Sequence, residues 1–138
     1  MDAELIERWN AELIERWNRK VHRNDTVYIV GDFIFRCHRP PEEYFDLLKG
    51  KKHLILGNHD KYWLKKVKVE KHLESVSPML YISVSGHPVV MCHYPMLTWP
   101  GVGRGRYMVY GHIHKQCEYG LLAAACQQGS DYLPNMRR

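Results

Sequence analysis

Four apolar stretches of this 138-residue chain end in side chains that can bind a metal ion. Asp32 follows TVYIV and a glycine, Asn58 follows HLIL and a glycine, His93 follows PVVMC, and His112 follows YMVY and a glycine. His114 comes two residues after His112. Such apolar runs predict strands, and loops at the carboxyl ends of strands carry the chemistry of α/β proteins. A carboxylate, an amide oxygen and three imidazoles, without a thiolate, suit Mn, Fe, Zn or a similar divalent ion.

The stretch Gly57-Asn58-His59-Asp60 also has a simpler interpretation. Glycine, asparagine and aspartate are common turn residues, so this stretch alone is equally typical of an ordinary turn. A single histidine, likewise, is more often a core or surface residue than a ligand. The combination of four strand ends with ligating side chains favours a metal site over four unrelated turns.

The helix that precedes the first strand contains a tandem repeat. The octapeptide AELIERWN occupies residues 3–10 and again residues 11–18, and its apolar spacing predicts one amphipathic helix over 3–19. Eight residues at about 100° each exceed two turns by roughly 80°, so the two apolar stripes are rotated relative to each other. We predict that the second copy packs on the core through Leu13, Ile14 and Trp17. The first copy would then form a self-association surface with Leu5, Ile6 and Trp9.

The remaining pattern predicts alternating strands and helices within a single domain, residues 1–138. Thr26–Val30 predicts a strand buried on both faces, and Pro40-Pro41 opens a helix that Gly50 ends. Further along we predict a strand at 53–56, a basic helical segment at 61–66, a short strand at 73–76, a hairpin of 79–84 with 88–92, a strand at 107–110, and a weakly ordered tail at 123–138.

The composition is that of a soluble globular protein, with 45% hydrophobic and 25% charged residues. No apolar run approaches the roughly 20 residues needed to cross a membrane, and the acidic start is not a secretory signal. The expected compartment is the cytoplasm, where Cys37, Cys92, Cys117 and Cys126 would stay thiols. Cys92 lies within an apolar run and is expected in the core.

The chain is basic, with a net charge of +5 and a pI of about 9.0. Lysines gather at positions 49–52 and 61–71. A positive field attracts phosphate-bearing ligands or nucleic acid, although a solvated surface is the simpler explanation for a charge of this size. Charge alone does not distinguish these alternatives.

The order of the motifs resembles that of the calcineurin-like metallophosphoesterases. The matching segments are GD at 31–32, GNHD at 57–60, an isolated His93, and GHIH at 111–114, which together span roughly two-thirds of the chain. The resemblance implies an α/β/β/α fold, a β-sandwich flanked by helices. It also implies a dinuclear metal centre that hydrolyses phosphomonoesters or phosphodiesters.

The resemblance implies a role for each candidate ligand. Asp32 would bridge two metal ions, Asn58, His93 and His112 would complete the shell of one ion, and His114 would bind the other. The family's Asp-x-His motif, which an N-terminal strand carries, does not occur in this sequence. We therefore expect a fold that is incomplete at its N-terminus, with one complete metal site and one incomplete site.

Two further residues gain roles from the resemblance. His59 would donate a proton to the leaving-group oxygen, and Arg36 would hold the phosphate. Position 35 is phenylalanine, where some family members have an acid that orients the catalytic histidine. Substrate specificity would lie in the loops at 36–41 and 98–106.

Three functions remain open from the sequence. The first is a metal-dependent phosphoesterase acting on a phosphate-ester substrate. The second is a degenerate, non-catalytic metal-binding domain that acts through self-association. The third is a nucleic-acid-binding or nuclease role based on the lysine clusters. A lost strand would expose unpaired backbone groups, so we also expect a homo-oligomer.

Overall fold

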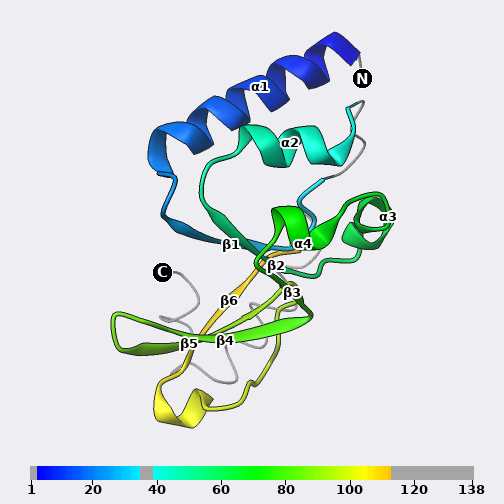
Figure 1. Cartoon of the computed structure of the whole chain (residues 1–138). Helices are drawn as coiled ribbons and strands as arrows, with labels where there is room; N and C mark the ends of the chain where they lie inside the picture. Colours follow the sequence, from blue (N-terminus) through cyan, green and yellow to red (C-terminus); the bar gives the residue numbers. More distant parts are fainter. Residues whose placement is uncertain (1–2, 35–38, 113–138) are drawn as a thin grey trace.

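The computed structural model describes residues 3–34 and 39–112, which form an α/β protein with two small sheets (Figure 1). The elements follow in the order α1 (Ala3–Lys20), β1 (Thr26–Val30), α2 (Pro41–Leu47), β2 (Lys51–Ile55), α3 (Asp60–Leu64), α4 (Val69–His72), β3 (Ser75–Ser77), β4 (Met79–Val84), β5 (His87–Cys92), the 3-10 helix η1 (Val102–Arg104) and β6 (Tyr107–Tyr110). None of the helices in these two ranges is long and apolar enough to span a membrane. The predicted tail at 123–138 lies outside the described residues.

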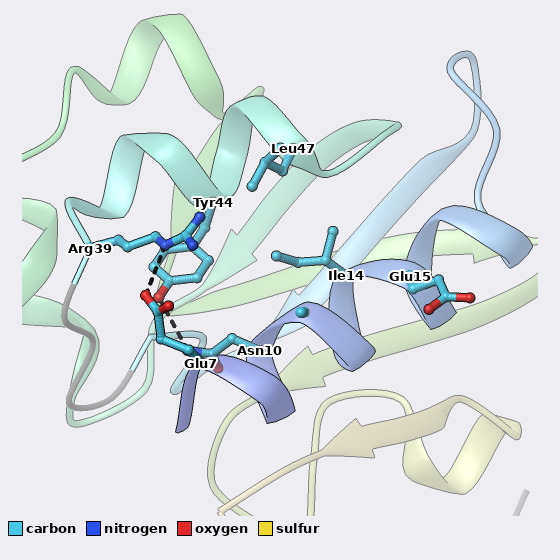
Figure 2. Close-up of a pocket in the computed structure, with 8 residues that line it drawn as sticks. Glu7, Asn10, Ile14, Glu15, Arg39, Tyr44 and Leu47 are labelled. Atoms are coloured by element: carbon cyan, nitrogen blue, oxygen red, sulfur yellow. Dashed lines mark hydrogen bonds and ion pairs between the residues drawn. The ribbon is translucent and has the colours of Figure 1, made fainter. Parts of the chain in front are cut away.

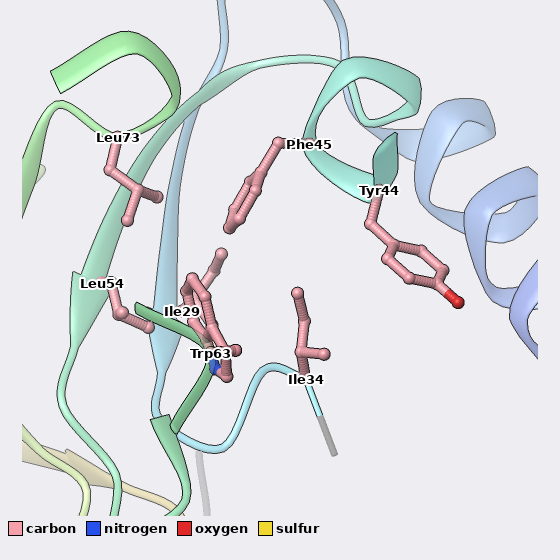
Figure 3. Close-up of a cluster of buried hydrophobic side chains, with 7 residues drawn as sticks. All are labelled: Ile29, Ile34, Tyr44, Phe45, Leu54, Trp63 and Leu73. Carbon is pink, nitrogen blue, oxygen red and sulfur yellow. The ribbon is translucent and has the colours of Figure 1, made fainter. Parts of the chain in front are cut away.

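The first sheet is parallel, with the strand order β1-β2-β3. Successive side chains along each strand point to opposite faces of the sheet. Ile29 and Leu54 therefore face the four helices, while Tyr28 and Ile55 face the other sheet. β1 therefore contacts apolar clusters on both faces, but of its five residues only Ile29 is buried, so the prediction of a strand buried on both faces is confirmed in part. The buried cluster between helices and sheet contains Ile29, Ile34, Tyr44, Phe45, Leu54, Trp63 and Leu73 (Figure 3).

The second sheet has the strand order β4-β5-β6 and contains the predicted hairpin. Ser85 and Gly86 join β4 to β5, and both have positive φ, as a tight two-residue turn requires. β6 returns parallel to β5. One face of this sheet meets the first sheet in a shared cluster of Ile55, Val89 and Met91, with Tyr28, Leu80, Ile82 and Tyr107 packed around it.

The other face of the second sheet is covered by the segment that follows β5. Trp99 packs there with Val90, Cys92 and Met108, so Cys92 is buried as expected. This segment ends at the start of β6, the opposite end of that strand from His112. Arg106, at the end of the 98–106 loop, therefore lies at the other end of β6 from His112, and the assignment of substrate specificity to this loop stays a prediction. The parallel pairing of β5 with β6 requires this long return.

Helix α1 runs through both copies of the octapeptide, and the second copy packs on the core only in part. Ile14 and Trp17 contact the helix-side cluster, as predicted, but Leu13 is 61% exposed, so its predicted burial was wrong. The row of Asn10, Ile14 and Asn18 faces α2 instead, since residues four apart share a helix face. Leu13, about 100° from Ile14, is turned out of this contact. The side chains of Leu5, Ile6 and Trp9 lie outside what the structure describes.

Polar groups hold α1 against α2. Asn18 Nδ2 donates to the Leu47 carbonyl (2.8 Å), and Asn18 Oδ1 accepts from the Lys49 N–H (3.0 Å). Asn10 Nδ2 donates to the Tyr44 hydroxyl (3.1 Å). Between the helices lies a cavity of about 240 Å³, drawn in Figure 2 and lined by Glu7, Asn10, Ala11, Ile14, Glu15, Arg39, Tyr44 and Leu47. None of these residues is a predicted metal ligand.

Two short elements differ from their predicted bounds. The predicted strand at 73–76 was placed too early, because α4 occupies Val69–His72 and β3 begins only at Ser75. Leu73 belongs to the helix-side core instead, with 6% of its surface exposed. The basic helical segment begins at Asp60 and ends at Leu64, one to two residues earlier than predicted. A four-residue stretch with two apolar positions, such as LESV at 73–76, does not distinguish a strand from the end of a helix.

Lys52 lies on the helix side of β2 and is only 5% exposed. Burial lowers the pKa of its ammonium group, because the charged form loses hydration. The folded state therefore carries a penalty below the lowered pKa, which disappears as the pH rises through that value toward 10.5. We expect Lys52→Met to raise the free energy of unfolding at pH 7 by about 1 kcal/mol. Urea unfolding should show this gain shrinking at alkaline pH, and no gain for Lys51→Met at the exposed neighbouring position.

Candidate metal centre

The two sheets bring four of the predicted ligands to one place. Asp32 follows β1, Asn58 follows β2, His93 follows β5 and His112 follows β6. Since β1 runs parallel to β2 and β5 runs parallel to β6, each sheet delivers two of these residues at the carboxyl ends of its strands. The site thus depends on the packing of one sheet against the other.

His93 Nε2 is the centre of the cluster. It lies 3.2 Å from Asp32 Oδ2, 3.2 Å from Asn58 Oδ1 and 3.2 Å from His112 Nδ1. The ligand atoms of Asp32, His93 and His112 all lie within 4.8 Å of one another, so this group could hold a metal ion. His93 is 2% exposed, so its ring is fixed by packing.

A second contact of the same ring fixes where its proton resides. His93 Nδ1 lies 2.9 Å from the carbonyl oxygen of Val30, which can only accept a hydrogen bond. Nδ1 therefore carries the proton, and in the neutral ring the lone pair of Nε2 points at the other ligand atoms. A carboxylate oxygen, an amide oxygen and an imidazole lone pair repel one another at these distances. A cation among them would remove that repulsion, so the residues present fit a divalent ion.

Two of the predicted ligands have a rarely populated backbone conformation. Asp32 has φ 52° and His112 has φ 67°, in the left-handed region that non-glycine residues seldom adopt. The one other described non-glycine residue with positive φ, Ser85 (φ 50°), belongs to the hairpin turn. Each such conformation costs about 1–3 kcal/mol and is typical of functional sites. The surrounding structure must therefore hold Asp32 and His112 in place.

Asp60 holds the loops that carry Asp32 and Asn58, whereas the sequence had suggested a turn residue or a ligand-capable side chain there. Its side chain is 0% exposed. Oδ2 accepts the N–H groups of Asp32 (2.8 Å) and Gly57 (2.8 Å), while Oδ1 accepts those of Phe33 (3.0 Å) and the Trp63 indole (2.8 Å). One carboxyl group thus joins the two loops to helix α3. Its position at the end of GNHD, three residues before a tryptophan, was a signal that sequence reasoning did not use.

Glycines let these loops approach the ligands closely. A Cβ on Gly31 (φ 76°) would lie 2.2 Å from His93 Nδ1. A Cβ on Gly57 would lie 2.4 Å from Asp32 Oδ1 and 2.6 Å from the Asp32 nitrogen. Neither position has room for a side chain. The glycines before Asp32 and Asn58 are therefore required by the site itself.

Comparison with known proteins adds one structural relative. No protein-family model and no curated protein matches the chain. The fold resembles that of AQ665. This protein of unknown function from Aquifex aeolicus aligns with a TM-score of 0.59 and 21% sequence identity, over 79% of this chain and 67% of its own. At that identity the likeness concerns the fold alone.

His59 is positioned at the site through its backbone. Its N–H donates to Asp32 Oδ1 (2.9 Å), which leaves Asp32 Oδ2 directed at His93. Its side chain is half-buried at the start of α3. The other predicted site residues, Arg36 and His114, lie outside the described residues.

We expect the cluster to couple cation binding to stability. Mn²⁺ at a hundred times its dissociation constant should raise the free energy of unfolding by about 2.7 kcal/mol, and EDTA should reverse the gain. Asp32→Asn removes one charged ligand and should abolish most of this gain, whereas Asp46→Asn on the exposed side of α2 should keep it. Equal Mn²⁺-dependent shifts in thermal unfolding for both variants would contradict a cation site at Asp32.

Proposed function

We propose that this chain is a metal-dependent phosphoesterase of the calcineurin-like type. The observation that carries the proposal is the convergence of Asp32, Asn58 and His112 on His93 Nε2. These residues occupy the same order along the chain as the motif series described above. Support also comes from the two packed sheets, on which the proposed four-layer α/β/β/α arrangement would be built.

In this proposal the cluster holds a divalent ion, which would supply charge neutralisation for phosphate oxygens and lower the pKa of a water molecule. The protein's own residues orient the reactants. Val30 keeps the Nε2 lone pair of His93 directed into the site, and the His59 N–H fixes the direction of the Asp32 carboxylate. The His59 imidazole would donate a proton to the departing alkoxide. The net charge of +5 would attract phosphate esters.

A second candidate is a non-catalytic metal-binding domain that acts through self-association. It is favoured by the exposure of Leu13 (61%) and Leu47 (45%) on α1 and α2, where apolar side chains face solvent. Both candidates share the cation site and differ in turnover. A homo-oligomer, by contrast, is compatible with either, so oligomeric state would not separate them.

Hydrolysis of p-nitrophenyl phosphate and bis-p-nitrophenyl phosphate with Mn²⁺ separates the two candidates. We expect His59→Ala to lower kcat by about 10²–10⁴-fold, the usual effect of removing a general acid, without changing Mn²⁺ affinity. Asn58→Ala should weaken Mn²⁺ binding, and excess Mn²⁺ should restore part of its activity.

The matched control is His22→Ala, at an exposed position before β1, which should behave as wild type. Absence of metal-dependent turnover in the wild type would favour the non-catalytic candidate. Turnover of single-stranded nucleic acid alone would instead indicate a nuclease.

A further inference from the structure

Tyr94 lies at the boundary between the cluster of predicted metal ligands and solvent. It follows His93 directly, at the carboxyl end of β5. Its ring centroid lies 5.0 Å from that of His93 and 4.9 Å from that of His112, with interplanar angles of 81° and 63°. His93 is 2% exposed and the Asp32 side chain is 21% exposed, but Tyr94 is 44% exposed. The cluster is recessed, and Tyr94 presents a free aromatic surface beside it.

A large part of the Tyr94 ring makes no contact with the two imidazoles and remains exposed to solvent. Edge-to-face contact with the two imidazoles uses only one part of the Tyr94 ring. The rest of the ring is exposed to solvent, directly beside the imidazoles of two predicted ligands. A phosphate held by the cluster would therefore carry its alcohol group past Tyr94. Aromatic side chains in such positions stack planar groups, and any planar ring offers the required face.

We propose that Tyr94 is a specificity-determining residue that selects phosphate esters whose alcohol bears a planar ring, such as a nucleobase or an aryl group. This inference rests on the proposed function. A ring that only supported His93 and His112 would affect cation binding and treat all esters alike. A ring that contacts the substrate would affect planar ligands and leave cation binding unchanged.

Two phosphonates of similar size provide the test, since their carbon–phosphorus bonds are not hydrolysed by phosphoesterases. Benzylphosphonate is planar at its ring and cyclohexylmethylphosphonate is not. Calorimetric titration of Mn²⁺-loaded wild type should show benzylphosphonate binding about tenfold more tightly, a modest value for base–aromatic stacking. Tyr94→Leu should reduce this preference to less than about twofold, and Tyr94→Phe should retain it. Mn²⁺ affinity should stay the same in both variants.

Tyr81→Leu is the matched control, because Tyr81 is 49% exposed and lies on β4, where its ring contacts Arg106. It should keep the full preference. The inference is overturned if wild type binds both phosphonates equally or neither, or if Tyr94→Leu weakens both together with Mn²⁺. If the wild type shows the binding preference but no turnover of p-nitrophenyl phosphate, the proposed function is overturned and only the binding role of Tyr94 remains.

Discussion

Replacing Asp60 with asparagine is expected to destabilise the fold by at least about 2 kcal/mol, since each buried donor left without an acceptor costs about 1–3 kcal/mol. Each carboxyl oxygen of Asp60 accepts two N–H groups, one pair on Oδ2 and another on Oδ1. An asparagine must point its NH₂ at one of these pairs in either orientation. Urea unfolding measures the loss, and Mn²⁺ titration should show weaker binding because the Asp32 and Asn58 loops are no longer joined.

Asp25→Asn is the appropriate control for this variant. Asp25 also accepts a backbone N–H, from His22 (2.7 Å), but its side chain is 50% exposed. Water can satisfy the groups that asparagine leaves, so the expected change is within about 0.5–1 kcal/mol. Equal losses for the two variants would show that Asp60 does not hold the loops.

Gly31→Ala is expected to disrupt the candidate metal centre, because the added methyl group has no room there. The new Cβ would lie 2.2 Å from His93 Nδ1 and 2.8 Å from the Gly57 Cα. His93 would have to leave the Val30 carbonyl, and the shared position of the ligand atoms would be lost. We expect no measurable Mn²⁺ binding and a loss of stability of about 1–3 kcal/mol from overpacking, beyond the backbone cost of alanine at positive φ.

Gly86→Ala isolates that backbone cost. Gly86 has φ 82°, close to the 76° of Gly31, but no atom lies within 4 Å of its added Cβ. The Gly86→Ala variant should have a free energy of unfolding only about 1 kcal/mol below that of wild type, and it should bind Mn²⁺ normally. Urea unfolding and calorimetry on both variants provide the comparison. If Gly31→Ala matched Gly86→Ala in both measurements, the close approach to His93 would not constrain the site.

Three strands were predictable at their observed bounds because their apolar runs are distinct. Thr26–Val30, Met79–Val84 and Tyr107–Tyr110 form strands at their predicted positions, and each run is bounded by turn residues. The runs at 26–30 and 107–110, together with those at 53–56 and 88–92, placed Asp32, Asn58, His93 and His112 at strand ends, and the structure brings these four together. The residue types therefore indicated a cluster, although not its geometry.

Other features depend on contacts between distant residues, which the sequence pattern does not reveal. The rotation of α1, which exposes Leu13, follows from the bonds that Asn10 and Asn18 make with α2 and the segment after it. The role of Asp60 depends on N–H groups up to 28 positions away. The direction of the 98–106 loop follows from the parallel pairing of β5 with β6. Local propensity cannot specify any of these.

The bond between His93 and Val30 joins positions 63 residues apart. We expect contacts of such separation to form late in folding, because the entropy cost of closing the intervening loop comes before the contact contributes stability. A cation at this centre would therefore act mainly on the unfolding rate and leave the folding rate nearly unchanged. During synthesis the four residues of this centre could not come together before His112 had emerged from the ribosome, so a cation that needs all of them would bind only after that point.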